Sequence, residues 1–196
     1  IAEVSGGKVN VIDAKKLRQA VIDDLIYNAV FSKDKAIKGN CRYLIRLCGE
    51  ALNTKPASIQ GLYEAMGRGE VSGFSVPAIN VRGLTYDTAR ATFRAALKNN
   101  VGAFIFEIAK SEMNYTDQSP YEYTCVVIAA AIKEGFQGPI FIQGDHFQMS
   151  AKNFAANRQK EIDGLKDLMK CAIDAGFYNI DIDSSTLVDL SKPAIV

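Results

Sequence analysis

The chain has 196 residues, of which 48% are hydrophobic and 23% are charged, and its formal net charge is +1. This balance is typical of one globular domain of ordinary size, or of part of a larger one. The near-neutral charge argues against nucleic acid or an anionic membrane surface as a partner, and the longest apolar run, residues 125–132, is too short to cross a bilayer.

The cysteine spacing bears on the cellular compartment. Cys41, Cys48, Cys125 and Cys171 include no C-x-x-C pair, which argues against a disulfide framework or a zinc–thiolate site. We therefore predict reduced thiols in a cytoplasmic protein. The amino end shows no signal-peptide pattern, but the chain opens on Ile1 rather than Met, so we expect that an upstream piece is missing.

Residues 1–72 are predicted to form an N-terminal helical extension. Residues 1–12 have no clear period and predict a loose lead-in. A helical stripe then begins at Asp13, Gly39 separates it from a second amphipathic run, and Pro56 introduces a third, short helix that ends near Gly67. We expect these apolar stripes to pack against the rest of the protein or against a second subunit.

From Gly73 onward, strands and helices alternate. The predicted strands are 74–81, 103–108, 138–146 and 178–182, and the predicted helices are 85–99, 119–135 and 157–175. Thr85 is expected to cap the first of these helices. Ser119, with Pro120 after it and Glu122 at the third helical position, predicts a capping box for the second. Residues 187–196 could begin another crossover.

The spacing of these units predicts the fold class. Helices that end at Asn100, Gly135 and Gly176 give a repeat of about 35–40 residues, the size of a βα unit. Alternating units predict parallel strands, either in an open doubly wound sheet or in a closed barrel. No glycine-rich phosphate fingerprint follows the first strand, which argues against a dinucleotide-binding fold.

The chemistry is expected at the carboxyl ends of these strands. The apolar run that begins at Gly138 ends in Asp145 and His146, the only histidine in the sequence. Alternation puts Gln143 and Asp145 on the face opposite Ile142. Polar residues stand near the end of every predicted strand, where barrels place their active sites. They are Asn80, Glu107, Gln143, Asp145, His146, Asp183 and Ser185.

Some of these residues have structural interpretations that the residue pattern leaves open. Gln143 and Asp181 lie deeper in their strands and could pair with each other or with water. Glu107 could form a salt bridge with Lys110 or Arg82. His146 beside carboxylates has the composition of a divalent metal site, but one histidine is too few for a closed zinc site.

Three segments resemble the class II, metal-dependent ketose-bisphosphate aldolases, the family of the fructose- and tagatose-bisphosphate aldolases. Residues 76–81 look like the first strand of that family with its asparagine. Residues 139–146 look like its third strand, which ends in an Asp-His pair, and residues 181–187 look like its fourth strand. The resemblance covers residues 74–190 and implies a TIM (β/α)8 barrel, of which this chain holds about four βα units in residues 73–196.

Carried onto this sequence, the resemblance assigns roles to individual residues. It implies that Asp145 is the catalytic carboxylate that transfers a proton at the carbon–carbon bond. It implies that His146 and Asp183 are metal ligands, most simply for zinc, with Asp189 competing for the place of Asp183. Asn80, Glu107, Gln143 and Ser185 become the substrate-binding residues.

Several positions depart from the pattern of that family. Gln143 stands where the family usually has a histidine, Phe147 follows the Asp-His pair in place of a small residue, and Lys110 lies where a phosphate-binding loop is common. Four strands instead of eight indicate the amino-terminal part of a longer protein, which should be a poor enzyme alone.

The expected function is therefore a metal-dependent aldolase-type lyase that acts on a phosphorylated ketose. The implied partner is a small sugar phosphate, and the expected assembly is a homo-oligomer, a dimer or tetramer. The alternative is a non-catalytic sugar-phosphate binding or regulatory protein on the same barrel. A Schiff-base aldolase using Lys110 is less favoured, because nothing nearby marks that lysine as buried with a lowered pKa.

Overall fold

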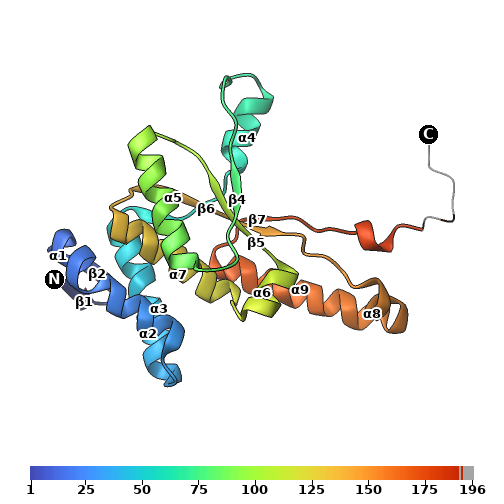
Figure 1. The fold of residues 1–196 in the computed structure, drawn as a ribbon, viewed down its shortest axis with the longest axis horizontal. Coiled ribbons are helices and arrows are strands. Elements are labelled where there is room, and N and C mark those ends of the chain that lie inside the picture. The colour runs from blue at the N-terminus through green and yellow to red at the C-terminus, as the bar shows by residue number, and fades with distance from the viewer. Residues whose placement is uncertain (190, 192–196) are drawn as a thin grey trace.

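The structure is a computed structural model that describes residues 1–189 and 191, and Figure 1 shows its course. The helices are α1 (Ala14–Ala20), α2 (Ile22–Phe31), α3 (Lys35–Ala51), α4 (Gln60–Gly67), α5 (Thr85–Asn99), α6 (Lys110–Thr116), α7 (Pro120–Glu134), α8 (Ala151–Ala156) and α9 (Arg158–Ala175), with a short 3-10 helix η1 (Ser185–Leu187). The strands are β1 (Ala2–Ser5), β2 (Lys8–Val11), β3 (Thr54–Pro56), β4 (Ala78–Asn80), β5 (Ile105–Ala109), β6 (Gly138–Asp145) and β7 (Asn179–Ile180).

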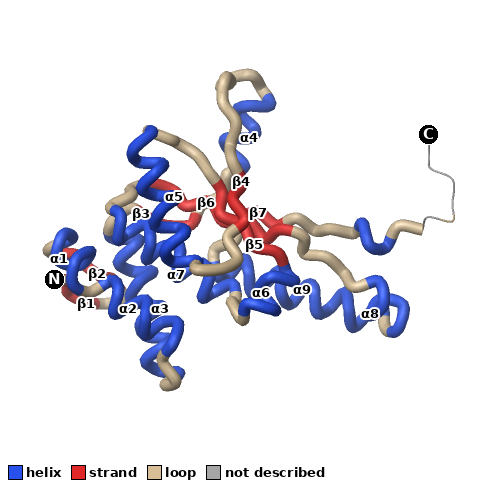
Figure 2. Tube along the Cα trace, in the orientation of Figure 1, coloured by secondary structure: helices blue, strands red, loops and turns tan. Residues whose placement is uncertain are grey.

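A parallel sheet of five strands lies at the centre of the molecule (Figure 2). Strand β6 pairs with β5 along one edge. Along its other edge β6 pairs first with β3, near Gly138, and then with β7, near Gln143. Strand β4 completes the sheet beyond β5. The predicted α/β class with parallel strands is confirmed.

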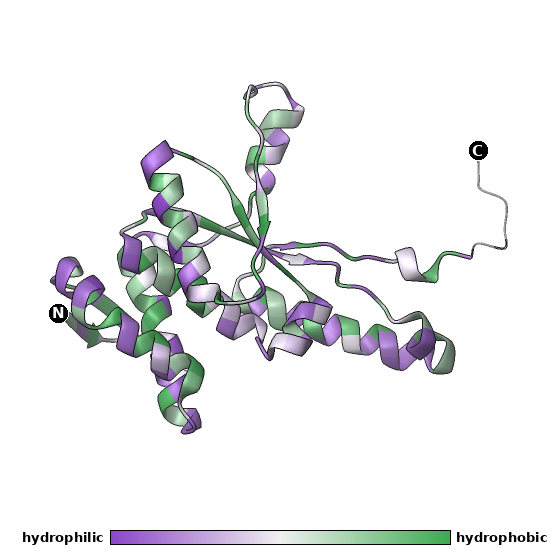
Figure 3. Ribbon diagram, viewed as in Figure 1, coloured by the Kyte–Doolittle hydropathy of each residue, from purple (hydrophilic) through white to green (hydrophobic). Residues whose placement is uncertain are grey.

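Helices cover one face of this sheet, and their shared core sets the orientation of the strands. The alternation in β6 is as predicted: Ile140 and Ile142 are buried, whereas Gln143 and Asp145 on the opposite face are only partly buried. Helix α7 is buried along almost its whole length and packs against α2, α3, α5 and α9. In Figure 3 the central strands are largely hydrophobic and the hydrophilic patches lie on the outer helices.

Four phenylalanines form an aromatic cluster in this core. Phe93 of α5 contacts Phe104, Phe106 and Phe136, with ring centroids 4.9–5.7 Å apart. The tilted and edge-on geometries are those that aromatic rings prefer. This cluster joins α5 and the end of α7 to β5.

The first 72 residues differ from the predicted helical extension in three places. Residues 1–12 were expected to be loose, but β1 and β2 form an antiparallel hairpin there. Gly39 lies inside α3 rather than between helices, because Asp34 caps α3 by accepting hydrogen bonds from the Ala36 and Ile37 backbones. Residues 54–56 form β3 and join the central sheet. The domain boundary at residue 72 remains a prediction.

Later boundaries agree with the sequence except in the loops. Helices α5, α7 and α9 end at Asn100, Gly135 and Gly176, each with a positive φ, as predicted. The first predicted strand, 74–81, is paired only over Ala78–Asn80, and two short helices, α6 and α8, occupy connections in which no helix was predicted.

The predicted caps are partly confirmed. Ser119 caps α7 by accepting from the Glu122 backbone, but the Glu122 carboxylate accepts from Arg42 at 2.6 Å. Thr85 was expected to cap α5, but Leu84 holds that position and Thr85 donates to Gln118 instead. Of the proposed crossover at 187–196, residues 190 and 192–196 lie outside the described residues.

Within the described part of the chain, no helix has both the length and the apolar composition needed to span a bilayer.

Candidate active site

The strand register brings three of the predicted polar residues, Asn80, Glu107 and Gln143, into one row across the sheet. Asn80 of β4 lies opposite Glu107 of β5, and Glu107 lies opposite Gln143 of β6. Asn179 of β7 continues the row beyond Gln143. Paired residues in a parallel sheet lie on the same face, so this row and Asp145, two residues further along β6, share the partly buried face.

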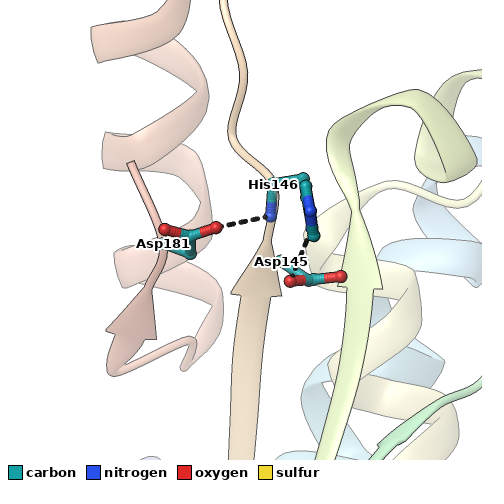
Figure 4. Close-up of side chains that lie close together, drawn as sticks. All are labelled: Asp145, His146 and Asp181. Carbon is teal, nitrogen blue, oxygen red and sulfur yellow. Dashed lines mark hydrogen bonds and ion pairs between the residues drawn. The ribbon is translucent and has the colours of Figure 1, made fainter. Parts of the chain in front are cut away.

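The backbone turns sharply between Asp145 and His146. Strand β6 ends at Asp145, and His146 has a φ of +45°, in the left-handed region that non-glycine residues seldom adopt. This turn brings the two side chains together, although neighbours on a regular strand point to opposite faces. His146 Nδ1 lies 2.8 Å from Asp145 Oδ1 (Figure 4).

The Asp145–His146 contact affects the pKa of the imidazole and determines which of its nitrogens is engaged. The hydrogen bond to Asp145, followed by the charge of that carboxylate, raises the pKa of His146 above its ordinary value. Nδ1 is engaged as the donor, so Nε2 is the nitrogen left for another ligand. The His146 side chain is 60% exposed, whereas that of Asp145 is 18% exposed, so the imidazole stands at the open side of the site.

Asp181 completes a cluster with these two residues. Its Oδ2 accepts a hydrogen bond of 3.3 Å from the His146 backbone, as Figure 4 shows. One ligand atom from each of Asp145, His146 and Asp181 lies within 4.8 Å of the others. Two carboxylates and one imidazole are donors that divalent transition metals accept.

Asp183 and Ser185, also predicted as site residues, belong to a separate contact group. Gln148 Nε2 donates to Asp183 Oδ2 at 2.7 Å and lies 3.3 Å from Ser185 Oγ. Hydrogen bonds with Ser185, and then that from Gln148, lower the pKa of Asp183. The structure thus puts Asp181 rather than Asp183 in direct contact with His146, and a metal-binding role for Asp183 remains a prediction.

Glu107 lies deeper on the same face. Gln143 Nε2 donates to Glu107 Oε2 at 3.2 Å, so Gln143 pairs with Glu107 and not with Asp181. The expected partners of Glu107 are engaged elsewhere, because Arg82 pairs with Glu112 and Lys110 pairs with Glu161. Burial, followed by the negative charge of Asp145, raises the pKa of Glu107.

Glu112 is a residue at this end of the sheet that sequence reasoning missed. Its side chain is 8% exposed and accepts from Asn80 Nδ2 and from the Ala109 backbone, each at 2.9 Å. It also pairs with Arg82 at 3.1 Å. Glu112 therefore ties the end of β4 to the end of β5. A glutamate three residues after a strand end is a weak capping signal that could have indicated it.

An open pocket of about 350 Å³ lies next to the cluster and carries three side-chain amides. Its lining residues are Gln60, Gln143, Tyr178, Asn179, Ile180 and Asp181. A larger pocket of about 800 Å³, between α2 and the starts of α5 and α7, contains none of the predicted site residues. The smaller pocket is the one that includes a member of the cluster, Asp181.

Phe147 fills the space above Gly144, which explains why a bulky residue can follow the Asp-His pair. The Phe147 ring is fully buried, and a Cβ at Gly144 would lie 2.5 Å from it. We predict that Gly144→Ala lowers the free energy of unfolding by about 1–3 kcal/mol, because the ring must move in a packed core.

Chemical denaturation checks this prediction against Gly164→Ala in α9. A Cβ at Gly164 meets no atom within 4 Å, so that change should stabilise the helix by about 0.5–1 kcal/mol. Equal stability of Gly144→Ala and the wild-type protein would contradict the packing argument.

The sequence matches no protein-family model, and no curated protein matches it.

Proposed function

We propose that the protein is a metal-dependent aldolase-type lyase, similar to the class II ketose-bisphosphate aldolases, and that it cleaves or forms a carbon–carbon bond in a phosphorylated ketose. The observation that carries the proposal is the Asp145, His146 and Asp181 cluster at the carboxyl ends of adjacent parallel strands. Barrel enzymes place their chemistry at this end of their strands.

The residues present fit a divalent cation, most simply zinc. His146 through Nε2 and Asp181 through a carboxylate oxygen would hold it, and the hydrogen bond from Nδ1 to Asp145 is the usual support of a metal-binding histidine. Bound there, the cation would act as a Lewis acid toward the carbonyl and hydroxyl oxygens of a ketose.

The chain's own groups account for the proton transfer and for the orientation of the substrate. Asp145 removes the proton of the hydroxyl group next to the bond that breaks, and returns it in the direction of synthesis. Glu107, Gln143, Asn80 and Ser185 offer oxygen and amide groups to the hydroxyls of the sugar. The hydrogen bond between Gln143 and Glu107 in the polar row orients both side chains before the substrate arrives.

The proposal includes the wider context of the site. The parallel sheet of βα units is the first part of a (β/α)8 barrel, whose remaining strands would supply further metal ligands and phosphate-binding loops. The protein acts in the cytoplasm as a homo-oligomer. The partly buried face of the sheet, which carries Phe141, Gln143 and Asp145, supports this proposal because a barrel interior would enclose it.

Removal of the metal tests the function. We expect the longer protein containing this chain to cleave ketose bisphosphate, to lose activity in a chelator, and to recover with Zn²⁺. The affinity for metal should fall as the pH is lowered through the raised pKa of His146, because only the neutral imidazole binds metal. Full activity of metal-free protein would rule out the proposed mechanism.

A second candidate is a non-catalytic sugar-phosphate binding or regulatory protein. The hydrogen bond between Gln143 and Glu107 favours it, because these two residues depart from the aldolase pattern and are hydrogen-bonded to each other. Calorimetric titration with fructose 1,6-bisphosphate distinguishes the two functions. Binding that survives Asp145→Ala, with no turnover by the wild-type protein, would favour the second.

A further inference from the structure

Side chains from three different elements hold three consecutive residues of the connection between β6 and α8. Lys110 Nζ of α6 donates to the Gln148 carbonyl at 2.9 Å. Thr186 Oγ1 of η1 donates to the Met149 carbonyl at 2.6 Å. Glu161 Oε1 of α9 accepts from the Ser150 backbone at 2.7 Å. A loop usually leaves such backbone groups to water, so these bonds fix its path.

Lys110 and Glu161 also contact each other. Their charged atoms are 3.4 Å apart, and their side chains are only 26% and 11% exposed. The Ser150 hydrogen bond lowers the pKa of Glu161, so the carboxylate stays charged beside the lysine. Charge-assisted hydrogen bonds to backbone groups are stronger than neutral ones. The pair therefore restrains both Gln148 and Ser150.

The restrained loop leads directly into the candidate site. The side chain of Gln148 donates to Asp183, and the backbone of the same residue is held by Lys110. On the other side, the Phe147 backbone donates to the Asp181 carbonyl at 2.9 Å. His146, in its left-handed conformation, immediately precedes Phe147 in the chain. The position of this loop thus affects the placement of His146, Asp181 and Asp183.

We propose that Lys110 is a positioning residue of the candidate site. By fixing the Gln148 carbonyl, it holds the Gln148 amide against Asp183 and keeps the loop in the path that presents His146 to Asp145 and Asp181. This role concerns the shape of the site and goes beyond the proposed lyase activity. It also accounts for the hydrogen bonds of this lysine, which donates to Glu161 and to the Gln148 carbonyl.

The chain offers a matched control in Lys133. This lysine is 18% exposed and, like Lys110, donates to a carbonyl, that of Arg18 at 2.9 Å, and to a carboxylate, that of Asp23 at 2.6 Å. It joins α7 to the start of the chain, away from the loop. Lys110→Met and Lys133→Met remove the same chemistry, and only the first should alter the site.

Amide hydrogen exchange, followed by NMR in protein without metal, is the primary measurement. In Lys110→Met we expect exchange at Ser150 and Ser185 to rise at least about tenfold, because the Ser150 amide bonds to Glu161, the partner of Lys110, and the Ser185 amide bonds to Asp183, which the Gln148 side chain contacts. Lys133→Met should leave both rates unchanged. Wild-type protection of these amides in Lys110→Met would overturn the proposal.

Titration with Co²⁺, read from its visible absorption, is the second measurement. Lys110→Met should bind Co²⁺ about 10–100-fold more weakly than wild type, the usual effect of losing a supporting contact, and Lys133→Met should not. Unchanged affinity in Lys110→Met would count against the positioning role. If the wild-type protein binds no Co²⁺, the proposed lyase function fails, and hydrogen exchange still decides the role of Lys110.

Discussion

Replacement of Asp145 by asparagine should lower kcat for ketose-bisphosphate cleavage by about 10²–10⁴-fold, the usual contribution of a general acid–base group. Asparagine keeps an oxygen that can accept the hydrogen bond from His146 Nδ1, so the imidazole keeps its orientation. Only the ability to take a proton is removed. KM should therefore change little, and steady-state kinetics on the protein used for the metal-removal test measures both constants.

Asp167→Asn is the matched control, because Asp167 is an exposed carboxylate on α9. Its kinetics should be those of the wild-type protein. A kcat in Asp145→Asn within a factor of about three of wild type would remove Asp145 from the mechanism. The imidazole of His146 and the carboxylate of Glu107 would then be the next candidates for the general base.

Truncation of Phe93 to alanine should lower the free energy of unfolding by about 3–5 kcal/mol. Phe93 is 1% exposed and contacts three other phenylalanine rings in the cluster that joins α5 to β5 and α7. Neighbouring rings cannot close the cavity without losing their contacts with one another. Urea denaturation, with equal m-values for the two proteins, measures the difference.

Phe31→Ala provides the comparison for this prediction. Phe31 is 67% exposed at the end of α2, so its truncation should change stability by no more than about 0.5 kcal/mol. A loss of less than about 1 kcal/mol in Phe93→Ala would show that the core adapts around the missing ring.

The alternation of side chains made the face of the sheet that carries the candidate site predictable. Ile140 and Ile142 alternate with Gln143 and Asp145 in the sequence, and the same alternation separates buried from partly buried residues in the structure. Helix ends were predictable for a similar local reason, since Gly135 and Gly176 adopt the left-handed conformation that ends a helix.

Positions that depend on contacts between distant segments could not be predicted in this way. Asp181 lies beside His146 because Gln143 pairs with Asn179, and no local pattern specifies that register. Lys110 contacts Gln148 and Glu161, which are 38 and 51 residues away in the sequence, and no local pattern predicts these contacts. The sequence predicts a break at Gly39, because a glycine inside a helix and a glycine between two helices look alike in sequence. The glycine lowers the stability of α3 by only about 1 kcal/mol, so the helix continues through it.

The pairing of β3 with β6 has a consequence for how the chain folds. Thr54 lies opposite Gly138, and its hydroxyl donates to the Phe136 carbonyl at 2.6 Å, so these contacts join segments about 80 residues apart. Helices α2 and α3 likewise pack on α7. Contacts of such long range close late, because the entropy of the intervening loop must be lost first. During synthesis, the apolar surface that α2 and α3 bury against α7 therefore stays exposed until residues 120–140 have been made.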